Sequence, residues 1–142
     1  MRRLGEQHRG RPVAQGERYR LGLTSELIAV ALLIAKGYLI LQRRYRSPVG
    51  EIDIVARRGR RLAFVEVKRR PTLDEAAESI TQRQQERVMR AAEWWLKGRP
   101  TVASTTDGPS FDVILLAPGK LPRHMRDAFD FAAGTPRARR RW

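Results

Sequence analysis

The spacing of apolar residues along the chain predicts two helices. From residue 17 to 36 apolar positions follow a helical period that becomes denser toward its end, in the run "LIAVALLIA". Gly37 follows directly, at the position of a helix C-cap glycine. The same period returns in "TQRQQERVMRAAEWWLKG" at 81–98, where Thr81 is the candidate N-cap. Both stretches are therefore expected to be helical.

Four other stretches have the β-branched and aromatic character of strands: residues 38–46, 51–56, 62–68 and 111–117. Short turns, "SPVG" and "RRGR", join the first three, which predicts an antiparallel meander. The segment "PTVASTTDGPS" reads as a loop before the fourth strand. That strand is nearly all apolar, which indicates burial on both faces, and it follows a helix, which favours parallel pairing with an earlier strand. The tail through "HMRDAFDFA" leaves room for one more short element.

The order helix, three strands, helix, strand predicts an α/β fold in which one mixed β-sheet is flanked by helices. The chain has 142 residues, enough for one domain, which we expect at residues 17–131. Residues 1–16 and 132–142 are rich in arginine and follow no apolar period. They are expected to be disordered basic ends.

Composition narrows the function. The chain has 29 Lys and Arg against 15 Asp and Glu, a formal charge of +14, which favours a polyanionic partner: nucleic acid first, then an anionic membrane surface. The absence of cysteine excludes disulfides, thiolate metal sites and a cysteine nucleophile. The apolar run at 27–35 is too short to cross a bilayer and lies too far along the chain for a signal peptide. A cytoplasmic location is the default expectation.

Three carboxylates stand inside otherwise apolar strands: Glu51, Asp53 and Glu66. If the second and third strands form a hairpin with the two-residue loop 59–60, Asp53 lies directly opposite Glu66, with Cβ atoms about 4.5–5.5 Å apart. A neighbouring register is also allowed by the sequence. Lys68 follows Glu66 on the same strand face, because side chains alternate between faces.

Opposed carboxylates in a sheet repel each other, and their burial costs several kcal/mol unless something compensates the charge. A hard cation such as Mg²⁺ or Mn²⁺ would do so, since it takes carboxylate and carbonyl oxygens and completes its shell with water and phosphate oxygens. Lys68 could then stabilise charge on a phosphoryl transition state or orient the attacking water. Glu26, at the end of the apolar stripe of the first helix, is a candidate third acidic group.

Structural explanations remain open for each of these residues. Glu66 and Lys68 could form an ion pair on a solvated face, worth at most about 1 kcal/mol. Glu26 could pair with Arg18 or another nearby base, and Glu51, beside a turn, could be solvated. The carboxylates alone do not decide between the two interpretations.

Other polar and aromatic residues are less informative. His8 and His124 are expected at the surface, because the pattern around them is poor. Trp94 and Trp95 fit packing at the core and its rim better than a platform for stacking bases. Asp112 begins a buried strand, and the sequence does not decide whether it supports a site or only the fold.

The stretches "GEIDIVA", "FVEVKRR", "AAEWWL" and "FDVILL", in this order, resemble the YraN-like family of small bacterial proteins. The spacing of Asp53, Glu66 and Lys68, with an acidic residue in the preceding helix, resembles the catalytic signature of the PD-(D/E)xK nuclease superfamily. The resemblance covers residues 16–131. The YraN-like family is similar in fold to archaeal Holliday-junction resolvases, so the resemblance implies a restriction-endonuclease-like core.

The resemblance also implies roles for individual residues. Glu26, Asp53 and Glu66 would be the metal-side carboxylates, the Val67 carbonyl a further ligand, and Lys68 the catalytic lysine. Gln85 matches a helical glutamine that would contact the site or the scissile phosphate. Three positions depart from the family pattern, which commonly has Asn, Lys and Arg where this chain has Arg44, Gln84 and Ser110.

Together these observations predict a Mg²⁺- or Mn²⁺-dependent endonuclease that hydrolyses phosphodiester bonds of branched or flapped DNA, with RNA the less favoured substrate and a homodimer plausible. Basic residues would contact phosphates without reading sequence: Arg18, Arg43, Arg44, Arg46, Arg69, Arg70, Arg83 and Arg87. The alternative is a catalytically silent nucleic-acid-binding module with the same fold. A membrane-surface or ribosome-associated adaptor explains the charge but none of the carboxylates.

Overall fold

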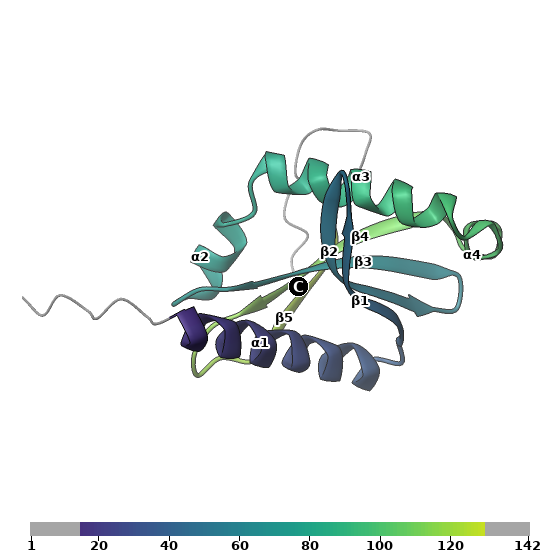
Figure 1. Ribbon diagram of the computed structural model, residues 1–142. Helices are drawn as coiled ribbons and strands as arrows, with labels where there is room; N and C mark the ends of the chain where they lie inside the picture. The colour runs from purple at the N-terminus through teal and green to yellow at the C-terminus, as the bar shows by residue number, and fades with distance from the viewer. Residues whose placement is uncertain (1–14, 130–142) are drawn as a thin grey trace, which may run out of the picture.

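The computed structural model describes residues 15–129, with side chains from Leu23 onward. The expected basic ends lie almost wholly outside this range, as do His8 and the side chain of Arg18. Five strands form one sheet in the order β1-β2-β3-β4-β5, with α1 on one face and α3 on the other (Figure 1). The elements are α1 (Gln15–Ala35), β1 (Leu39–Ser47), β2 (Gly50–Arg58), β3 (Arg61–Arg69), α2 (Leu73–Glu78), α3 (Gln82–Lys97), α4 (Pro100–Ser104), β4 (Pro109–Leu116) and β5 (Arg123–Phe129).

Helix α1 ends as its sequence predicts. Gly37 has a φ of +87°, which glycine adopts without the steric cost of a Cβ. Its N–H donates to the Ile34 carbonyl at 2.9 Å, and the N–H of Tyr38 donates to the Leu33 carbonyl at 2.9 Å. The helix begins at Gln15, two residues before the expected start.

Strands β1, β2 and β3 form the predicted antiparallel meander. In the β2–β3 hairpin Arg58 pairs with Arg61 and Ile54 with Val65, so the loop consists of the two residues 59–60. Of the two registers that the sequence allowed, this is the one that aligns the carboxylates. Pairing between β1 and β2 shifts by one residue between Ile40 and Gln42, where β1 carries a bulge.

The second half of the chain confirms the mixed sheet. Strand β4 pairs parallel with β3, from Leu62 opposite Pro109 to Arg69 opposite Leu116. Strand β5 then pairs antiparallel with β4 and supplies the short element that the tail allowed. In the described part of the chain, no helix has both the length and the apolar content needed to cross a membrane.

Two short helices were not predicted. Helix α2 begins after Thr72, whose side chain accepts a hydrogen bond from the Glu75 N–H at 3.1 Å, and it has acidic residues in its first turn. The expectation of a loop at 100–110 is wrong for residues 100–104, which form α4. Pro100 ends α3, but its constrained φ and missing N–H also suit the first position of the next helix.

The sheet separates two apolar cores. Val55, Phe64 and Trp95 belong to the core beneath α3, which also takes residues of β4 and β5. Ala29, Ile54 and further residues form the core beneath α1. As expected, β4 is buried on both faces, Trp95 lies in a core, and Trp94 remains about half exposed.

Helix α3 approaches β2 most closely at Gly50. A Cβ on this residue would collide with the carbonyl oxygen of Arg87 in α3, and it would also lie 3.3 Å from the Arg87 Cα. The gap between helix and strand therefore admits only glycine. Since Arg87 and Asp53 belong to these two elements, the contact sets how α3 stands relative to the strand carboxylates.

We expect Gly50→Ala to lower the free energy of unfolding by about 1–3 kcal/mol, because the methyl group forces α3 away from the sheet. Gly98→Ala is the matched control, since the nearest atom to its added Cβ lies at an ordinary 3.8 Å. Urea denaturation followed by circular dichroism measures both. Equal midpoints for the two variants would contradict the close approach.

Candidate active site

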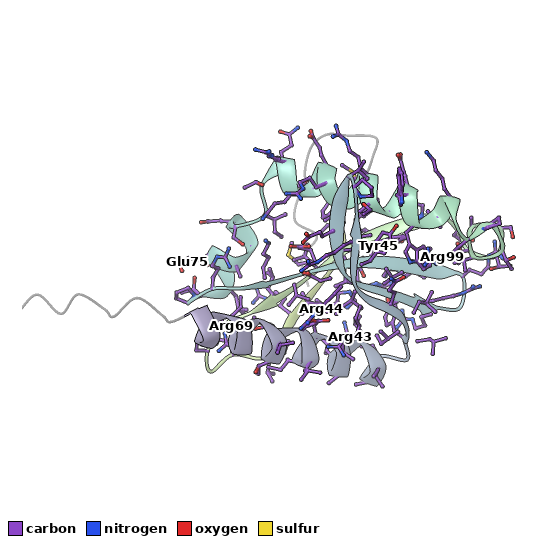
Figure 2. The ribbon with its side chains drawn as sticks, in the orientation of Figure 1. Arg43, Arg44, Tyr45, Arg69, Glu75 and Arg99 are labelled. Carbon is purple, nitrogen blue, oxygen red and sulfur yellow. The ribbon has the colours of Figure 1, made fainter. Side chains whose placement is uncertain are left out.

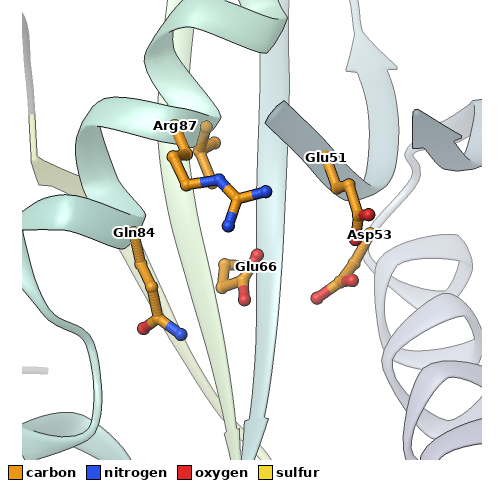
Figure 3. A pocket seen from close by; sticks show the side chains of 6 residues that line it. Glu51, Asp53, Glu66, Gln84 and Arg87 are labelled. Atoms are coloured by element: carbon orange, nitrogen blue, oxygen red, sulfur yellow. The ribbon is translucent and has the colours of Figure 1, made fainter. Parts of the chain in front are cut away.

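The β2–β3 hairpin brings Asp53 and Glu66 together. They lie directly beyond Ile54 and Val65, the last residues that β2 and β3 pair at this end of the hairpin. The Val67 N–H also donates to Asp53 Oδ2 at 2.8 Å. Val55 and Phe64 lie two residues closer to the hairpin loop and belong to the core beneath α3. Because side chains two residues apart share a strand face, the carboxylates lie on the face that α3 covers. Figure 3 shows the pair from close by.

Burial sets the charge state of this pair. Burial, followed by the neighbouring charge of Asp53, raises the pKa of Glu66 to about 7, although the ion pair with Lys68 acts in the opposite direction. Burial also raises the pKa of Asp53, although the Val67 N–H and Lys68 favour its charged form. Two ionised carboxylates are thus unfavourable here without an additional cation.

The carboxylates line a pocket of about 120 Å³ between the hairpin and α3 (Figure 3). The strands contribute its acidic wall and α3 its opposite wall; the lining residues are Glu51, Asp53, Glu66, Gln84, Arg87 and Val88. In Figure 3 the guanidinium group of Arg87 points toward the carboxylates of Glu66 and Glu51. The pocket therefore combines hard oxygen donors with a cation positioned to meet an anionic ligand.

Lys68 projects into the same site as Glu66. Only 8% of the residue is exposed, and its Nζ lies 3.2 Å from Glu66 Oε1. The predicted sharing of one strand face by Glu66 and Lys68 is therefore observed. An ammonium group at this depth is worth more electrostatically than a surface one, because the surrounding dielectric constant is low.

Glu26 lies at the sheet side of α1, only 6% exposed, and two arginines of β1 bind it. Arg43 Nε donates to its Oε1 at 3.0 Å and Arg44 Nε to its Oε2 at 2.6 Å (Figure 2). Its charge still contributes to raising the pKa of Asp53. Among residues whose side chains are described, no three His, Asp or Glu groups converge as ligands of one ion. In this structure Glu26 is therefore an ion-pair partner, and its role toward a metal stays a prediction.

Arg44 adopts an unusual backbone conformation, with a φ of +50°. Asparagine tolerates this region better than arginine does. The sequence resemblance implied an Asn at this position, which this backbone conformation would suit. In this chain Arg44 occupies the position and forms an ion pair with Glu26.

The two neighbouring glutamines of α3 face different ways. Gln85 is only 7% exposed and lies three residues before Val88 and seven before Ala92, along the buried stripe of the helix. Gln84 lines the pocket instead. The resemblance predicted Gln85 as the residue that contacts the site, whereas Gln84 is the glutamine that lines this pocket; adjacent helix positions differ in direction by about 100°.

Of the predicted phosphate-binding arginines, Arg87 lines this pocket, and the others are distributed over several elements. Arg83 and Arg87 are exposed on α3, and Arg46 is exposed near the end of β1. Arg70 follows β3 and donates to the Arg69 carbonyl at 2.7 Å. Arg43 and Arg44 are engaged with Glu26, so their charge is already partly compensated.

A second buried charge network was missed by sequence analysis. His124 was expected at the surface, but it is 9% exposed, and its Nε2 lies 2.7 Å from Asp112 Oδ2. Arg61 donates two hydrogen bonds to the Asp112 carboxylate, at 2.8 and 2.7 Å, and Lys36 Nζ lies 2.8 Å from His124 Nδ1. Burial would raise the pKa of Asp112, but these hydrogen bonds outweigh it and lower the pKa to about 2. The network joins the end of α1 to three strands.

The raised pKa of Glu66 predicts a pH-dependent stability in the absence of divalent metal. The folded state keeps a proton up to about pH 7, whereas the unfolded chain releases it near pH 4.5, so the free energy of unfolding falls as the pH rises through this window. Glu66→Gln reduces this slope, although the raised pKa of Asp53 also contributes to it, and the variant should be more stable than wild type by up to about 3 kcal/mol at pH 8. Urea denaturation in EDTA from pH 4.5 to 8, with the exposed Glu51→Gln as control, measures this. Parallel curves for wild type and Glu66→Gln would rule it out.

Asp112→Ala should destabilise the fold by about 3–5 kcal/mol, because it leaves Arg61 and His124 buried without their acceptor. Asp107→Ala serves as the control: its ion pair with Arg60 is well exposed on both sides and should contribute less than about 1 kcal/mol. Thermal unfolding of both variants at pH 7 compares them. A loss for Asp112→Ala as small as that for Asp107→Ala would show that the network is not a main source of stability.

Known proteins share this sequence over most of its length. Residues 25–116 match the profile described as "Uncharacterised protein family UPF0102". A UPF0102 protein of Nitrobacter winogradskyi is 54% identical over 112 residues, which are 79% of this chain and 93% of the relative. One from Bradyrhizobium diazoefficiens is 52% identical over 121 residues, 83% of this chain and 90% of the relative. The resemblance to the YraN-like family is thereby confirmed, and the chain belongs to protein family UPF0102.

Proposed function

We propose that this protein is a metal-dependent endonuclease that hydrolyses phosphodiester bonds of DNA. One observation carries the proposal: two partly buried, mutually repelling carboxylates line a pocket, and one of them, Glu66, forms an ion pair with the buried Lys68. A purely structural sheet has no need for this arrangement, since apolar residues at Asp53 and Glu66 would pack without the electrostatic cost. Family membership is consistent with the proposal but does not specify an activity.

The donor set fits Mg²⁺ or Mn²⁺. Asp53 and Glu66 offer hard carboxylate oxygens, and Mg²⁺ commonly uses one or two carboxylates while substrate phosphate and water complete its shell. The N–H of Val67 points to Asp53, and the carbonyl of a strand residue points to the same side as its N–H, so Val67 can add its oxygen. Glu26 could join only by giving up its bonds to Arg43 and Arg44. The ion would act as a Lewis acid and lower the pKa of a bound water.

The remaining groups suit the transition state of phosphodiester hydrolysis. Lys68, held next to Glu66, can donate to a phosphoryl oxygen on which negative charge develops. Arg87 stands across the pocket from the strand carboxylates and can hold a neighbouring phosphate. The residues of the protein thus supply positioning and charge for this reaction.

The substrate is inferred from charge and from the resemblance to resolvases. The exposed arginines Arg46, Arg70, Arg83 and Arg87 would contact the phosphate backbone, which positions a nucleic acid without reading its sequence. Selection of branched or flapped DNA in the cytoplasm would then depend on shape. A homodimer would provide the two sites needed for symmetric cutting of a junction.

The proposal is tested with labelled single strand, duplex, flap, fork and four-way junction in Mg²⁺ or Mn²⁺. Wild type should cleave at least one substrate, and Asp53→Asn and Lys68→Ala should each lower the rate about 10²-fold or more, while binding persists. Asp107→Ala is the control, since Asp107 forms an exposed ion pair with Arg60 and does not line the pocket. Affinity should fall steeply as salt rises, because phosphate contacts release counterions.

A catalytically silent nucleic-acid-binding module is the second candidate. The ion pairs of Glu26 with Arg43 and Arg44 favour it, because they hold one predicted acidic ligand away from a metal. Salt-sensitive binding without metal-dependent cleavage of any substrate, unchanged by Asp53→Asn, would overturn the nuclease proposal in favour of this module.

A further inference from the structure

The side chain of Gln84 connects Lys68 to the junction between α2 and α3. With its amide oxygen turned toward Lys68, Gln84 accepts a hydrogen bond from Lys68 Nζ at 3.0 Å, and its amide nitrogen donates to the Ser79 carbonyl at 3.1 Å. The reversed amide would direct N–H groups at an ammonium and its oxygen at a carbonyl, and it would gain one hydrogen bond, from the Thr81 N–H at 3.3 Å. The orientation with two hydrogen bonds and no opposed donors is therefore favoured. Gln84 therefore completes a bridge from β3 to the helices.

Gln84 and Ser79, which form the helix side of this bridge, are each held by further hydrogen bonds. The Gln84 backbone N–H donates to the Thr81 side chain at 3.2 Å, at the first turn of α3. Ser79 is held at the end of α2, where its N–H donates to the Glu75 carbonyl at 3.0 Å and its hydroxyl to the Ala76 carbonyl at 2.7 Å. The bridge thus begins at a capped helix terminus rather than in a free loop.

Lys68 contacts two acceptors of different kinds, Glu66 and Gln84. Glu66 is also a proposed metal ligand, and a cation bound to its carboxylate would weaken its hold on the ammonium group. Gln84 is neutral and has no such competing role. Its oxygen orients Lys68 without neutralising the positive charge that a phosphoryl oxygen would meet.

We propose that Gln84 positions Lys68 for catalysis, an inference that rests on the proposed nuclease function for its effect on rate. Gln84 acts through Lys68 and is a positioning residue. Its removal lets the ammonium group move within the pocket, and a displacement of about 1 Å in an active site can cost about 10²-fold in rate. Substrate affinity depends on the surrounding arginines and should not change.

Gln84→Met tests this, because it keeps the length of the side chain and removes the acceptor. Gln84→Glu restores an acceptor oxygen, and Gln82→Met is the matched control on the exposed first turn of the same helix. Lysine-selective ¹H–¹⁵N spectra of the metal-free protein report hydrogen exchange of the Lys68 ammonium group. Exchange should accelerate several-fold in Gln84→Met, return toward the wild-type rate in Gln84→Glu and stay unchanged in Gln82→Met.

Single-turnover cleavage and DNA binding complete the test. For Gln84→Met the cleavage rate should fall about 10- to 100-fold at unchanged Kd, with partial recovery in Gln84→Glu. Unchanged exchange at Lys68, or accelerated exchange with a cleavage rate within twofold of wild type, would overturn the inference. If wild type cleaves nothing, the proposed function fails, and the exchange measurement alone then decides whether Gln84 holds Lys68.

Discussion

The alignment of Asp53 with Glu66 is the constraint on which the rest of the site depends. The two-residue loop of the β2–β3 hairpin sets the register, and a shift by one residue would turn every side chain of a strand to the opposite face. The hairpin is held between two apolar cores, so it cannot relieve the repulsion by slipping. The stability of the sheet thus maintains an electrostatically unfavourable pair, which is a common property of sites that bind a cation.

Several arginines are engaged within the fold itself. Arg61 binds Asp112, and Arg43 and Arg44 bind Glu26. The guanidinium group of Arg58 lies 4.7 Å from the Tyr38 ring centre, and Arg57 donates to Thr105. A count of basic residues therefore overstates the charge offered to a polyanion. The arginines on α3 and near the strand ends are better placed to contribute to binding.

Helix α3 has two functions in this architecture. Trp95 and its neighbours fill the core above the sheet, and the first turns provide one wall of the pocket. The close approach at Gly50 joins these functions, because it fixes the distance between the helix backbone and β2. A change in core packing beneath α3 would consequently displace Gln84 and Arg87 relative to the strand carboxylates.

The sequence by itself determined the local features: the end of α1 at Gly37, the cap of α3 at Thr81, the meander and the face shared by Glu66 and Lys68. These follow from turn chemistry and side-chain periodicity over a few residues. It also narrowed the hairpin to two registers. Only the tertiary structure decided between them, because burial of both strand faces selects one pairing.

Tertiary structure likewise decided which side chains meet across long separations. Glu26 pairs with two arginines of β1, Gln84 rather than Gln85 lines the pocket, and His124 reaches Asp112 through the pairing of β5 with β4. Helical periodicity restricts a residue to a face but does not orient that face against a sheet. The packing of helices on the sheet sets that orientation, and it depends on contacts between residues far apart in the chain.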